Sequence, residues 1–490
     1  MRAELSTVGT ASRIEGPLLF LRRNVRASLS EAVEVTGEDG RQRLGRIVSL
    51  DEEHMVVELL ESTAGLSLAT TRVRFHGRPL SFPVGPDILG RVLDGVGRPI
   101  DGGPPIAARN ELRIDGLPLN PAARADPQDF IETGLSSIDL LNSMVRGQKL
   151  PIFSVSGLPH DRMATRIVQR ARLRDETAGR FAIVFAGIGI PHDTAETFRR
   201  AMQATGALRH TAMFLNLASE SSSQRLLTPR FALTAAEYLA FEQDMHVLVV
   251  MTDMTNYCEA LREVSASRGE VPARKGYPGY LYSDLATLYE RAGILQNRKG
   301  SLTQLPILTM PAGDISHPVP DLSGYITEGQ IVLDRDLDRR GIEPPVDVLP
   351  SLSRLMKDGI GEGYTDPDHP ALAQQLYAAY ARADSVRRLA SVVGAEGLPV
   401  LDRKFLRFGD EFEGRLVHQS EARTLEESMD LAWRLLRELP HSVLDRLSDA
   451  QIERHLGEDA RAEADEQTED GQAEEEPSEQ VEGPQAEEDR

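Results

Sequence analysis

Three continuous apolar runs in the middle of the chain constrain its fold more than any other feature of the sequence. They read FAIVFAGIGI from Phe181, HVLVVMTD from His246 and LPILTM from Leu305. Amphipathic stretches of helix length separate them, and strands that are apolar on both faces are typical of a parallel sheet covered by helices on each side. The region therefore predicts βαβ units and an α/β domain of the nucleotide-binding type.

The regions before this α/β region carry other patterns. Toward the N-terminus, EAVEV, the turn GEDG and TRVRFHG, which places Val73 and Phe75 on one face, predict a small antiparallel β-barrel over residues 1–78. The following LGRVLDGVGRPIDGGPPI has too many Gly and Pro residues for a continuous helix or strand and predicts a connector of fixed turns. Connector and α/β region together span residues 79–364.

After about Thr365 the strand patterns end, and residues 365–456 predict a bundle of helices. A first helix ends at Gly394, a suitable C-cap, and a second begins at Thr424 and Glu427, which are spaced as a capping box. The apolar stripes expected in the core are Leu372, Leu376, Tyr380, Ala383 and Leu389 on the first helix, and Met429, Trp433 and Leu436 on the second.

The last segment, residues 457–490, contains 15 acidic and 2 basic residues and supplies most of the net charge of −21. Because it has almost no large apolar side chains to bury, we expect a disordered acidic tail. Elsewhere no face concentrates Lys and Arg with interleaved aromatic residues, so nucleic acid is not an expected partner.

The sequence also indicates the cellular compartment in which the protein is found. Its apolar runs are far shorter than the roughly 20 residues that span a bilayer, and the N-terminal MRAELSTVGT has no signal-peptide pattern. The only cysteine, Cys258, excludes an intrachain disulfide. We expect a cytoplasmic protein.

The segment SVSGLPHDRMATRI, from Ser154, stands where a nucleotide-binding chain carries its phosphate loop. Such a loop needs the pattern G-x-x-x-x-G-K-[ST], in which backbone N–H groups cradle the phosphates, the lysine reaches their oxygens and the hydroxyl ligates Mg²⁺. Started at Val155 or at Gly157, the segment fails this pattern at its end. The residues found at the G-K-[ST] positions are His160, Asp161 and Arg162 in the first register, and Arg162, Met163 and Ala164 in the second.

This degenerate loop therefore predicts the shape of a phosphate loop without its charge. Gly157, Leu158, Pro159 and His160 are the candidate nucleotide-binding residues, with Gly157 and Pro159 shaping the turn. An aspartate at this place repels phosphate, and a histidine that is neutral for much of its population near pH 7 does not replace the lysine. Strong binding of Mg-ATP by this loop is not expected.

A second candidate is Asp253, which ends an apolar strand where a Mg²⁺-side carboxylate belongs. Two roles are open for it: to hold a metal ion through water, or to cap the following turn or pair with a cation. Glu196 is the carboxylate offered by FAGIGIPHDTAETF, but it does not follow a strand directly. No H-E-x-x-H or cysteine cluster predicts a zinc site, and His317 is interpreted as a packed loop residue.

Five longer strings carry a resemblance to a known family. They are IETGLSSIDLLNSMVRGQKLPIFSVSGLPH, ALTAAEYLAFEQDMHVLVVMTDMTNYCEALREVS, KGYPGYLYSDLATLYERAG, DISHPVPDLSGYITEGQIVLDRDL and PPVDVLPSLSRLMKDGIGEGYT. The chain closely resembles, over about residues 5–456, the B subunit of V/A-type rotary ATPases. The resemblance implies an N-terminal β-barrel, a central RecA-like domain of the P-loop type with a degenerate loop, and a C-terminal helical bundle. In this family the B subunit is the non-catalytic partner in the hexameric head.

The resemblance also implies roles for single residues. Arg354, in LPSLSRLM, matches the arginine that the B subunit inserts into the catalytic site of its neighbour, where a guanidinium suits the charge on transferred phosphoryl oxygens. Tyr277 and Tyr280 lie in the family's subunit-interface segment. They are expected either near the neighbour's nucleotide or only against their own loop. Val155 stands where the family commonly has glycine.

For the whole assembly the resemblance implies three copies alternating with three catalytic A subunits, with ATP or ADP and Mg²⁺ at the interfaces. A central rotor stalk and peripheral stalk subunits are further expected partners, and the membrane is reached only through the complex, which translocates protons or sodium ions. The chain is then not catalytic alone. The rival hypotheses are a purely structural ring subunit and a self-sufficient hexameric ATPase, which would need an intact G-K-[ST] and a strand-end glutamate.

Overall fold

The computed structural model describes residues 5–7, 11–116, 119–174 and 179–457. The chain forms two compact units: unit 1 reaches to His369 and also contains Glu413–Ser428, and unit 2 contains Pro370–Phe412 and the chain from Met429 onward. The predicted disordered tail lies outside the described residues, except for Gly457. The boundaries predicted after residues 78 and 364 stay predictions.

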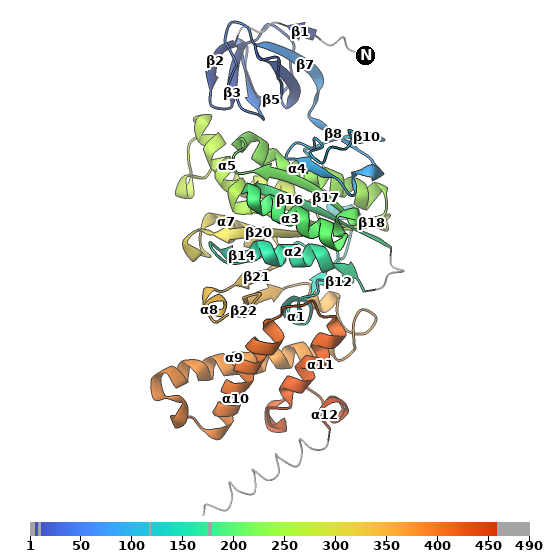
Figure 1. Ribbon diagram of the computed structural model, residues 1–490, viewed down its shortest axis with the longest axis vertical. Helices are drawn as coiled ribbons and strands as arrows, with labels where there is room; N and C mark the ends of the chain where they lie inside the picture. The colour runs from blue at the N-terminus through green and yellow to red at the C-terminus, as the bar shows by residue number, and fades with distance from the viewer. Residues whose placement is uncertain (1–4, 8–10, 117–118, 175–178, 458–490) are drawn as a thin grey trace, which may run out of the picture. The chain divides into compact units, whose positions relative to one another are not determined.

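An antiparallel sheet forms the N-terminal β-barrel within unit 1 (Figure 1), with the strand order β1-β7-β4-β5-β6-β3-β2. As predicted, Val73 and Phe75 both enter the barrel core, and the turn GEDG closes with a hydrogen bond from Gly40 N to Gly37 O. The strands are β1 Leu5–Thr7, β2 Ala11–Glu15, β3 Leu18–Arg22, β4 Glu31–Thr36, β5 Gln42–Leu50, β6 His54–Leu59 and β7 Arg72–Pro79.

The three apolar runs form neighbouring strands of a mainly parallel sheet, as predicted. The order of its main path is β22-β21-β14-β20-β18-β16-β17-β9, and β22 is antiparallel to β21. The strands are β9 Val92–Asp94, β14 Ile152–Val155, β16 Arg180–Ile190, β17 Thr211–Leu217, β18 Met245–Thr252, β20 Ser301–Met310, β21 Gly329–Leu333 and β22 Val346–Ser353. The connector thus adds β9 to one edge, a strand too short to show a sequence pattern.

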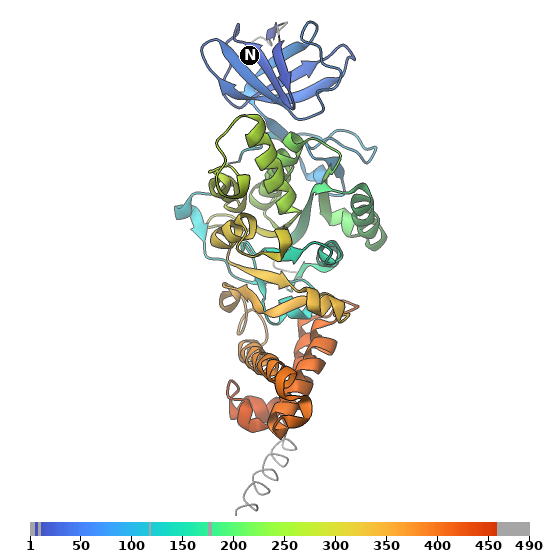
Figure 2. The ribbon, with the colours of Figure 1, turned by 90° about the vertical axis from the view of Figure 1, so that its left-hand side faces the viewer.

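Helices cover both faces of this sheet (Figures 1 and 2). The connections that follow β14 and β16 run toward β17, whereas those that follow β17, β18 and β20 run the opposite way. Because such crossovers are right-handed, α2 and α3 lie on one face, and α4, α5 and α7 lie on the other. Their bounds are α2 His160–Arg170, α3 His192–Thr205, α4 Ser222–Glu237, α5 Met254–Ser267 and α7 Pro318–Ile326.

Short elements complete unit 1. They are the strands β8 Ser81–Val84, β10 Asn110–Arg113, β11 Arg124–Ala125, β12 Phe130–Glu132, β13 Met144–Val145, β15 Arg172–Leu173 and β19 Gly293–Leu295, and the helices α1 Ser136–Asp139, α6 Leu281–Tyr289 and α8 Arg335–Arg339. No helix of the described residues is long and apolar enough to cross a bilayer.

The C-terminal region is helical, as predicted, with α9 His369–Val393, α10 Val400–Glu411, α11 Leu425–Leu436 and α12 Asp449–Leu456. The capping box is confirmed, since Thr424 N donates to Glu427 Oε2 at 2.8 Å and Glu427 N donates to Thr424 Oγ1 at 3.2 Å. The expected core residues are buried with the exception of Leu389. That prediction was wrong: in α9, all of which the structure describes, no residue after Val386 is buried, and Leu389 is 46% exposed.

Candidate functional site

The degenerate loop lies at a natural ligand-binding position of the sheet. β14 and β20 are neighbours, but the helices that follow them, α2 and α7, go to opposite faces. In open α/β sheets, ligands bind at the carboxyl ends of strands at such a point. Between β14 and α2 the chain turns through Gly157, whose φ of +91° favours glycine. The structure thus gives residues 156–160 the predicted strand-loop-helix shape.

Two side chains of this loop pack against the protein itself. Leu158 is buried, and the imidazole Nδ1 of His160 lies 2.9 Å from Ser154 Oγ. Asp161 occupies the first turn of α2, where burial raises the pKa of its carboxyl group and the nearby Asp253 adds to the increase. A carboxyl group therefore stands where a phosphate loop needs an ammonium group. Because the next residue is Arg162, a hydroxyl for Mg²⁺ is also missing, and the loop does not fit Mg-ATP.

Asp253 lies at the carboxyl end of β18 and is the N-cap of α5. One carboxylate oxygen accepts hydrogen bonds from Thr255 N at 2.7 Å and Thr309 N at 3.2 Å, and the other accepts one from the Thr309 hydroxyl. The carboxylate thus caps α5 and fixes the end of β20. Its role toward a metal ion stays a prediction.

The two tyrosines of the interface segment differ in exposure. Tyr277 is buried, donates its hydroxyl to Glu259 Oε1 and packs edge-on against His317 with ring centroids 5.6 Å apart. Tyr280 is 39% exposed and donates to Glu270 Oε2 at 2.8 Å; burial and this carboxylate raise its pKa to about 12. Tyr277 therefore packs against its own chain, and Tyr280 presents part of its ring to solvent.

His317 is buried, as its interpretation as a packed residue requires. It is the N-cap of α7 and accepts a hydrogen bond from Val319 N at 3.4 Å. Within the described ranges, no group of three or more His, Cys, Asp or Glu side chains is placed to hold a metal ion.

Arg354 follows β22 directly and is exposed. Its backbone N donates to Glu328 O at 3.0 Å, but its guanidinium has neither a hydrogen bond nor an ion pair with any residue that the structure describes. Arg354 is therefore a charge that the fold presents outward without using it internally.

The structure does not bring Arg354 together with the degenerate loop. β22 runs antiparallel to β21, so Ser353 lies opposite Gly329 at the amino end of β21. Gly157 and Asp253 lie at the carboxyl ends of the parallel strands, which is the opposite end of the strands from Ser353. Lys149 lies beside Glu328, the residue that bonds Arg354, and Val155 precedes the degenerate loop. These two residues are joined by an extended chain, which at about 3.3 Å per residue separates the two ends of the strands by about 20 Å.

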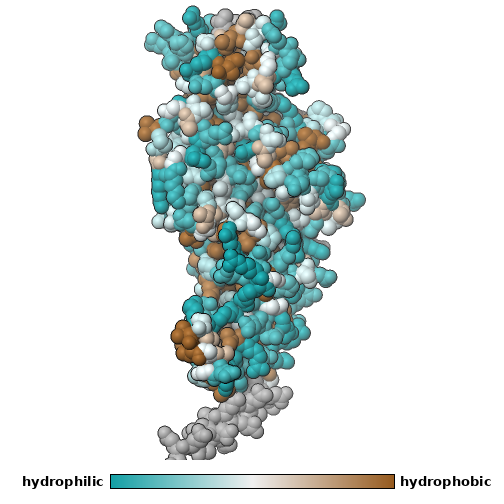
Figure 3. All heavy atoms as spheres, turned by 60° about the vertical axis from the view of Figure 1, so that its left-hand side comes forward, coloured by the Kyte–Doolittle hydropathy of each residue, from teal (hydrophilic) through white to brown (hydrophobic). Residues whose placement is uncertain are grey.

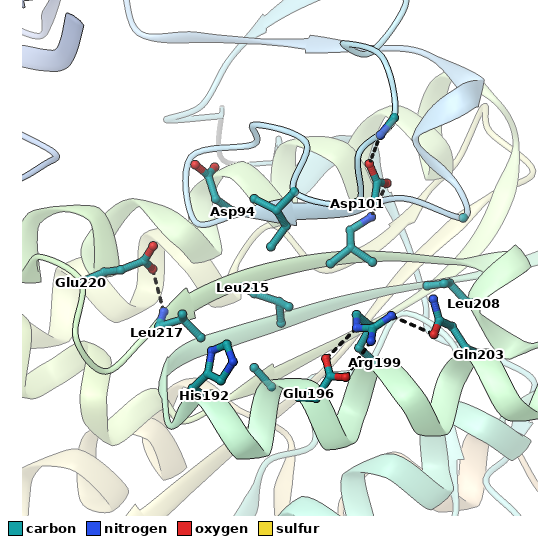
Figure 4. A pocket seen from close by; sticks show the side chains of 15 residues that line it. Asp94, Asp101, His192, Glu196, Arg199, Gln203, Leu208, Leu215, Leu217 and Glu220 are labelled. Carbon is teal, nitrogen blue, oxygen red and sulfur yellow. Dashed lines mark hydrogen bonds and ion pairs between the residues drawn. The ribbon is translucent and has the colours of Figure 1, made fainter. Parts of the chain in front are cut away.

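Glu196, the carboxylate weighed after β16, faces a different place. It lies on α3, where Arg199 Nη2 and Arg200 Nε both donate to Glu196 Oε1 at 2.6 Å, and these arginines lower its pKa to about 2. Its helix lines a pocket of about 700 Å³ between α3, β17 and the connector turn that holds Asp94 and Asp101 (Figure 4). Glu196 is thus paired with cations in the wall of this pocket.

The sequence did not reveal which residues of the same chain hold the candidate site residues in place. Thr309 bonds Asp253 across 56 residues, and Lys149 bonds Glu328, beside Arg354, across 179 residues. Both lie in strings whose patterns predict only a strand or carry the family resemblance. No local pattern announces such contacts, because they form between neighbouring strands of the folded sheet.

Family models match three successive parts of the chain. They are the beta-barrel domain of the ATP synthase alpha/beta family at residues 11–77, its nucleotide-binding domain at residues 134–353, and the C-terminal domain of V and A type ATP synthase at residues 358–456. Together they cover the barrel, the central sheet and the helices described above.

Curated relatives and a solved structure show the same similarity. The chain is 53% identical over 449 residues to the V-type ATP synthase beta chain of Halothermothrix orenii, covering 91% of this chain and 96% of the relative. It is 54% identical over 446 residues to the B subunit of the A-type ATP synthase of Aeropyrum pernix, with the same coverage of 91% and 96%. The solved ATP synthase subunit NeqB of Nanoarcheaum equitans is 38% identical and superposes with a TM-score of 0.69, covering 86% of this chain and 98% of that one.

Proposed function

Because the chain belongs to the B subunits of the V- and A-type ATP synthases, we propose that it completes the catalytic ATP sites of a neighbouring A subunit and couples them to rotation. In this proposal three copies alternate with three A subunits in a ring. The direction of the reaction, synthesis or hydrolysis, depends on an ion gradient that other subunits carry.

The observation that carries the proposal is the unused guanidinium of Arg354. It is exposed and has no side-chain partner in the described part of the chain, and it lies at the end of the strands opposite to the chain's own degenerate loop. An arginine so placed does not reach a nucleotide bound at that loop. It suits a phosphoryl group at the surface of another subunit, because its fork of donors matches the developing charge on the transferred oxygens.

In this proposal the neighbouring A subunit binds the nucleotide on which Arg354 acts. Mg-ATP bound there provides the phosphoryl group on which negative charge develops. This chain contributes Arg354 as an arginine finger in trans and excludes water around it. Tyr280, half-exposed beside Glu270, is the second side chain that we propose at this interface, and Tyr277 supports the segment from behind.

The proposal also extends to the stalk subunits. The C-terminal helices carry an apolar patch of five exposed residues at the end of α9 and the start of α10, which suits a contact with the central rotor stalk or a peripheral stalk. Its members are Leu389, Val392, Val393, Val400 and Leu401.

The first experiment is steady-state hydrolysis of Mg-ATP by this chain alone and in a stoichiometric ring with its A subunit. We expect no turnover alone and strong turnover in the ring. Robust turnover by the chain alone would reveal a self-sufficient ATPase, in spite of Asp161 in the loop.

The Arg354→Ala variant then separates a chemical role from a purely structural one. We expect the ring to assemble and its turnover to fall by about 10³, because arginine fingers contribute about 10³ to 10⁵ in rate. Sedimentation of the ring checks the assembly. Near-normal turnover in an assembled Arg354→Ala ring would leave the chain a structural ring subunit.

A further inference from the structure

Arg354 is joined through its backbone to Glu328, a residue with a carboxylate, but its guanidinium does not pair with that carboxylate. β21 and β22 are antiparallel, with Gly329 opposite Ser353, and the bond from Arg354 N to Glu328 O continues this register by one pair. Opposite charges on neighbouring chain segments attract, and the long side chain of arginine gives its guanidinium a wide reach, so a Glu328–Arg354 ion pair is one arrangement open to these residues. It is absent among the described residues.

A buried lysine already neutralises the carboxylate of Glu328. Lys149 Nζ lies 2.7 Å from Glu328 Oε1, and Lys149 N donates to Glu328 Oε2 at 2.7 Å. Lys149 thus contacts both carboxylate oxygens and supplies a cation that neutralises them. The side chain of Lys149 is only 6% exposed, and its Nζ also bonds Glu290 Oε1 at 3.1 Å. An ion pair that is largely withdrawn from water is screened little and competes well against an exposed partner.

The backbone beside Arg354 is fixed by a second set of contacts. Gln148, which is fully buried, donates from Nε2 to Ser353 Oγ at 3.0 Å and to Glu328 O at 3.2 Å. Ser353 Oγ in turn donates to Ser143 O at 2.8 Å. The start of the Arg354 side chain is therefore held in place while its guanidinium stays unbound.

We propose that Lys149 is a positioning residue for Arg354: by holding the carboxylate of Glu328, it keeps the guanidinium available to a phosphoryl group of the neighbouring subunit. The inference rests on the proposed function. Without Lys149, the carboxylate of Glu328 loses its cation, and Arg354, which is joined to Glu328 by a backbone hydrogen bond, is the available replacement. An arginine that spends most of its time in this internal pair is competent for only the remaining fraction of the time, and the observed rate falls to that fraction of the original rate.

The test is a double-mutant cycle in the assembled ring with the A subunit. For Lys149→Met we expect kcat for Mg-ATP to fall by ~10-fold with KM unchanged, because the interaction lost acts only in the transition state. Adding Glu328→Gln removes the competing carboxylate and returns kcat to within ~2-fold of the parent. Glu328→Gln alone and Lys149→Arg, which keeps the charge, leave kcat within the same ~2-fold.

A merely structural role of Lys149 gives another pattern. Loss of packing would change KM, ring assembly or thermal stability along with kcat, and Glu328→Gln would not restore the rate. Either result would overturn the inference. Arg354→Ala in the same rings tests the proposed function separately. If it lowers turnover but the cycle shows no rescue, only the role of Lys149 is wrong; if it leaves turnover intact, the role of Arg354 itself is wrong.

A substitution on the surface tests the capture of Arg354 by a carboxylate without changing the buried Lys149. Leu352 is 48% exposed and lies two residues before Arg354 on the same face of β22. Leu352→Glu offers the guanidinium a new carboxylate and is expected to lower kcat by ~10-fold, whereas the matched Leu352→Gln leaves it within ~2-fold. Equal kcat values for the two variants would contradict the idea that a nearby carboxylate captures Arg354.

Discussion

At the scale of single residues, burial decides which titratable groups hold their charge. His369 is fully buried, with Nε2 2.9 Å from Leu140 O and Nδ1 3.0 Å from Thr365 Oγ1. Burial lowers its pKa to about 4, although the Leu140 carbonyl partly opposes this. Burial has the opposite effect on an acid: it raises the pKa of Asp139 to about 7, although Thr133 and Gly134 donate three hydrogen bonds to its carboxyl group.

A pH dependence of stability follows from His369. The unfolded chain binds a proton on this histidine below about pH 6.5, whereas the folded chain does so only near pH 4, so the free energy of unfolding falls as the pH drops between these values. The loss reaches roughly 3 kcal/mol when both states are protonated. We expect His369→Gln to remove this contribution.

Urea unfolding at pH 7 and pH 4.5 measures the effect. Because Asp139 contributes with the opposite sign, stabilising the protein as the pH falls through 7, the comparison is between variants rather than between pH values. His210, which is exposed, provides the matched control as His210→Gln. An equal pH dependence in the parent and in His369→Gln would refute the prediction.

At the scale of secondary-structure elements, one carboxylate joins the barrel to the α/β layer of unit 1. Glu58 on β6 has a fully buried side chain and accepts hydrogen bonds of 3.0 Å from Arg46 on β5, Ser223 on α4 and Arg268, the C-cap of α5. Removing one partner of a buried charge cluster leaves the others without compensation, which is more costly than losing an exposed ion pair.

We predict that Glu58→Gln lowers the free energy of unfolding by about 2–3 kcal/mol. A fully buried pair would lose more, but Arg46 and Arg268 are 20% and 23% exposed, so water screens part of their charge. Chemical denaturation of the isolated chain measures the change. Glu53→Gln, on the exposed turn between β5 and β6, is the control and is expected to stay within about 0.5 kcal/mol. A similar effect of both substitutions would show that Glu58 does not join the two layers.

At the scale of the whole molecule, the chain exposes surface that an isolated protein does not need. The apolar patch of α9 and α10 includes Val392 at 83% exposed and Val400 at 58% exposed. Figure 3 shows apolar side chains gathered on the C-terminal helices. Contiguous exposed apolar residues of this kind mark interaction sites more often than single ones do. Together with the exposed guanidinium of Arg354, the patch indicates surfaces that bind other subunits.

We predict that Val392→Asp leaves the isolated chain stable but weakens its binding to the stalk subunits. The residue is exposed, so its substitution changes the free energy of unfolding by less than about 0.5 kcal/mol. Loss of one apolar contact from an interface lowers the affinity by about fivefold or more. Titration of the assembled ring with the stalk subunits measures this, and Arg434→Asp, exposed on α11 outside the patch, is the control. Unchanged stalk affinity of Val392→Asp would place the contact elsewhere.

The sequence by itself determined what depends on neighbours in the chain. Apolar runs of strand length between amphipathic stretches predicted the βαβ order, and Thr424 and Glu427, three residues apart, predicted the start of α11. Asp161, at the lysine position of the loop, predicts weak binding of Mg-ATP there. These features need no partner from another element, because periodicity, capping and the charge of a loop are local properties.

Only the tertiary structure decided which distant groups meet. In the folded chain, β9 is the outer strand of the sheet and Leu389 is exposed to solvent. Asp253 bonds Thr309, 56 residues away in the sequence, and Lys149 bonds Glu328, 179 residues away. The physical reason is that these contacts arise from strand order and register. Strands far apart in the chain become neighbours about 5 Å apart in the sheet, and their side chains then compete for the same charges. The availability that we propose for Arg354 depends on such contacts.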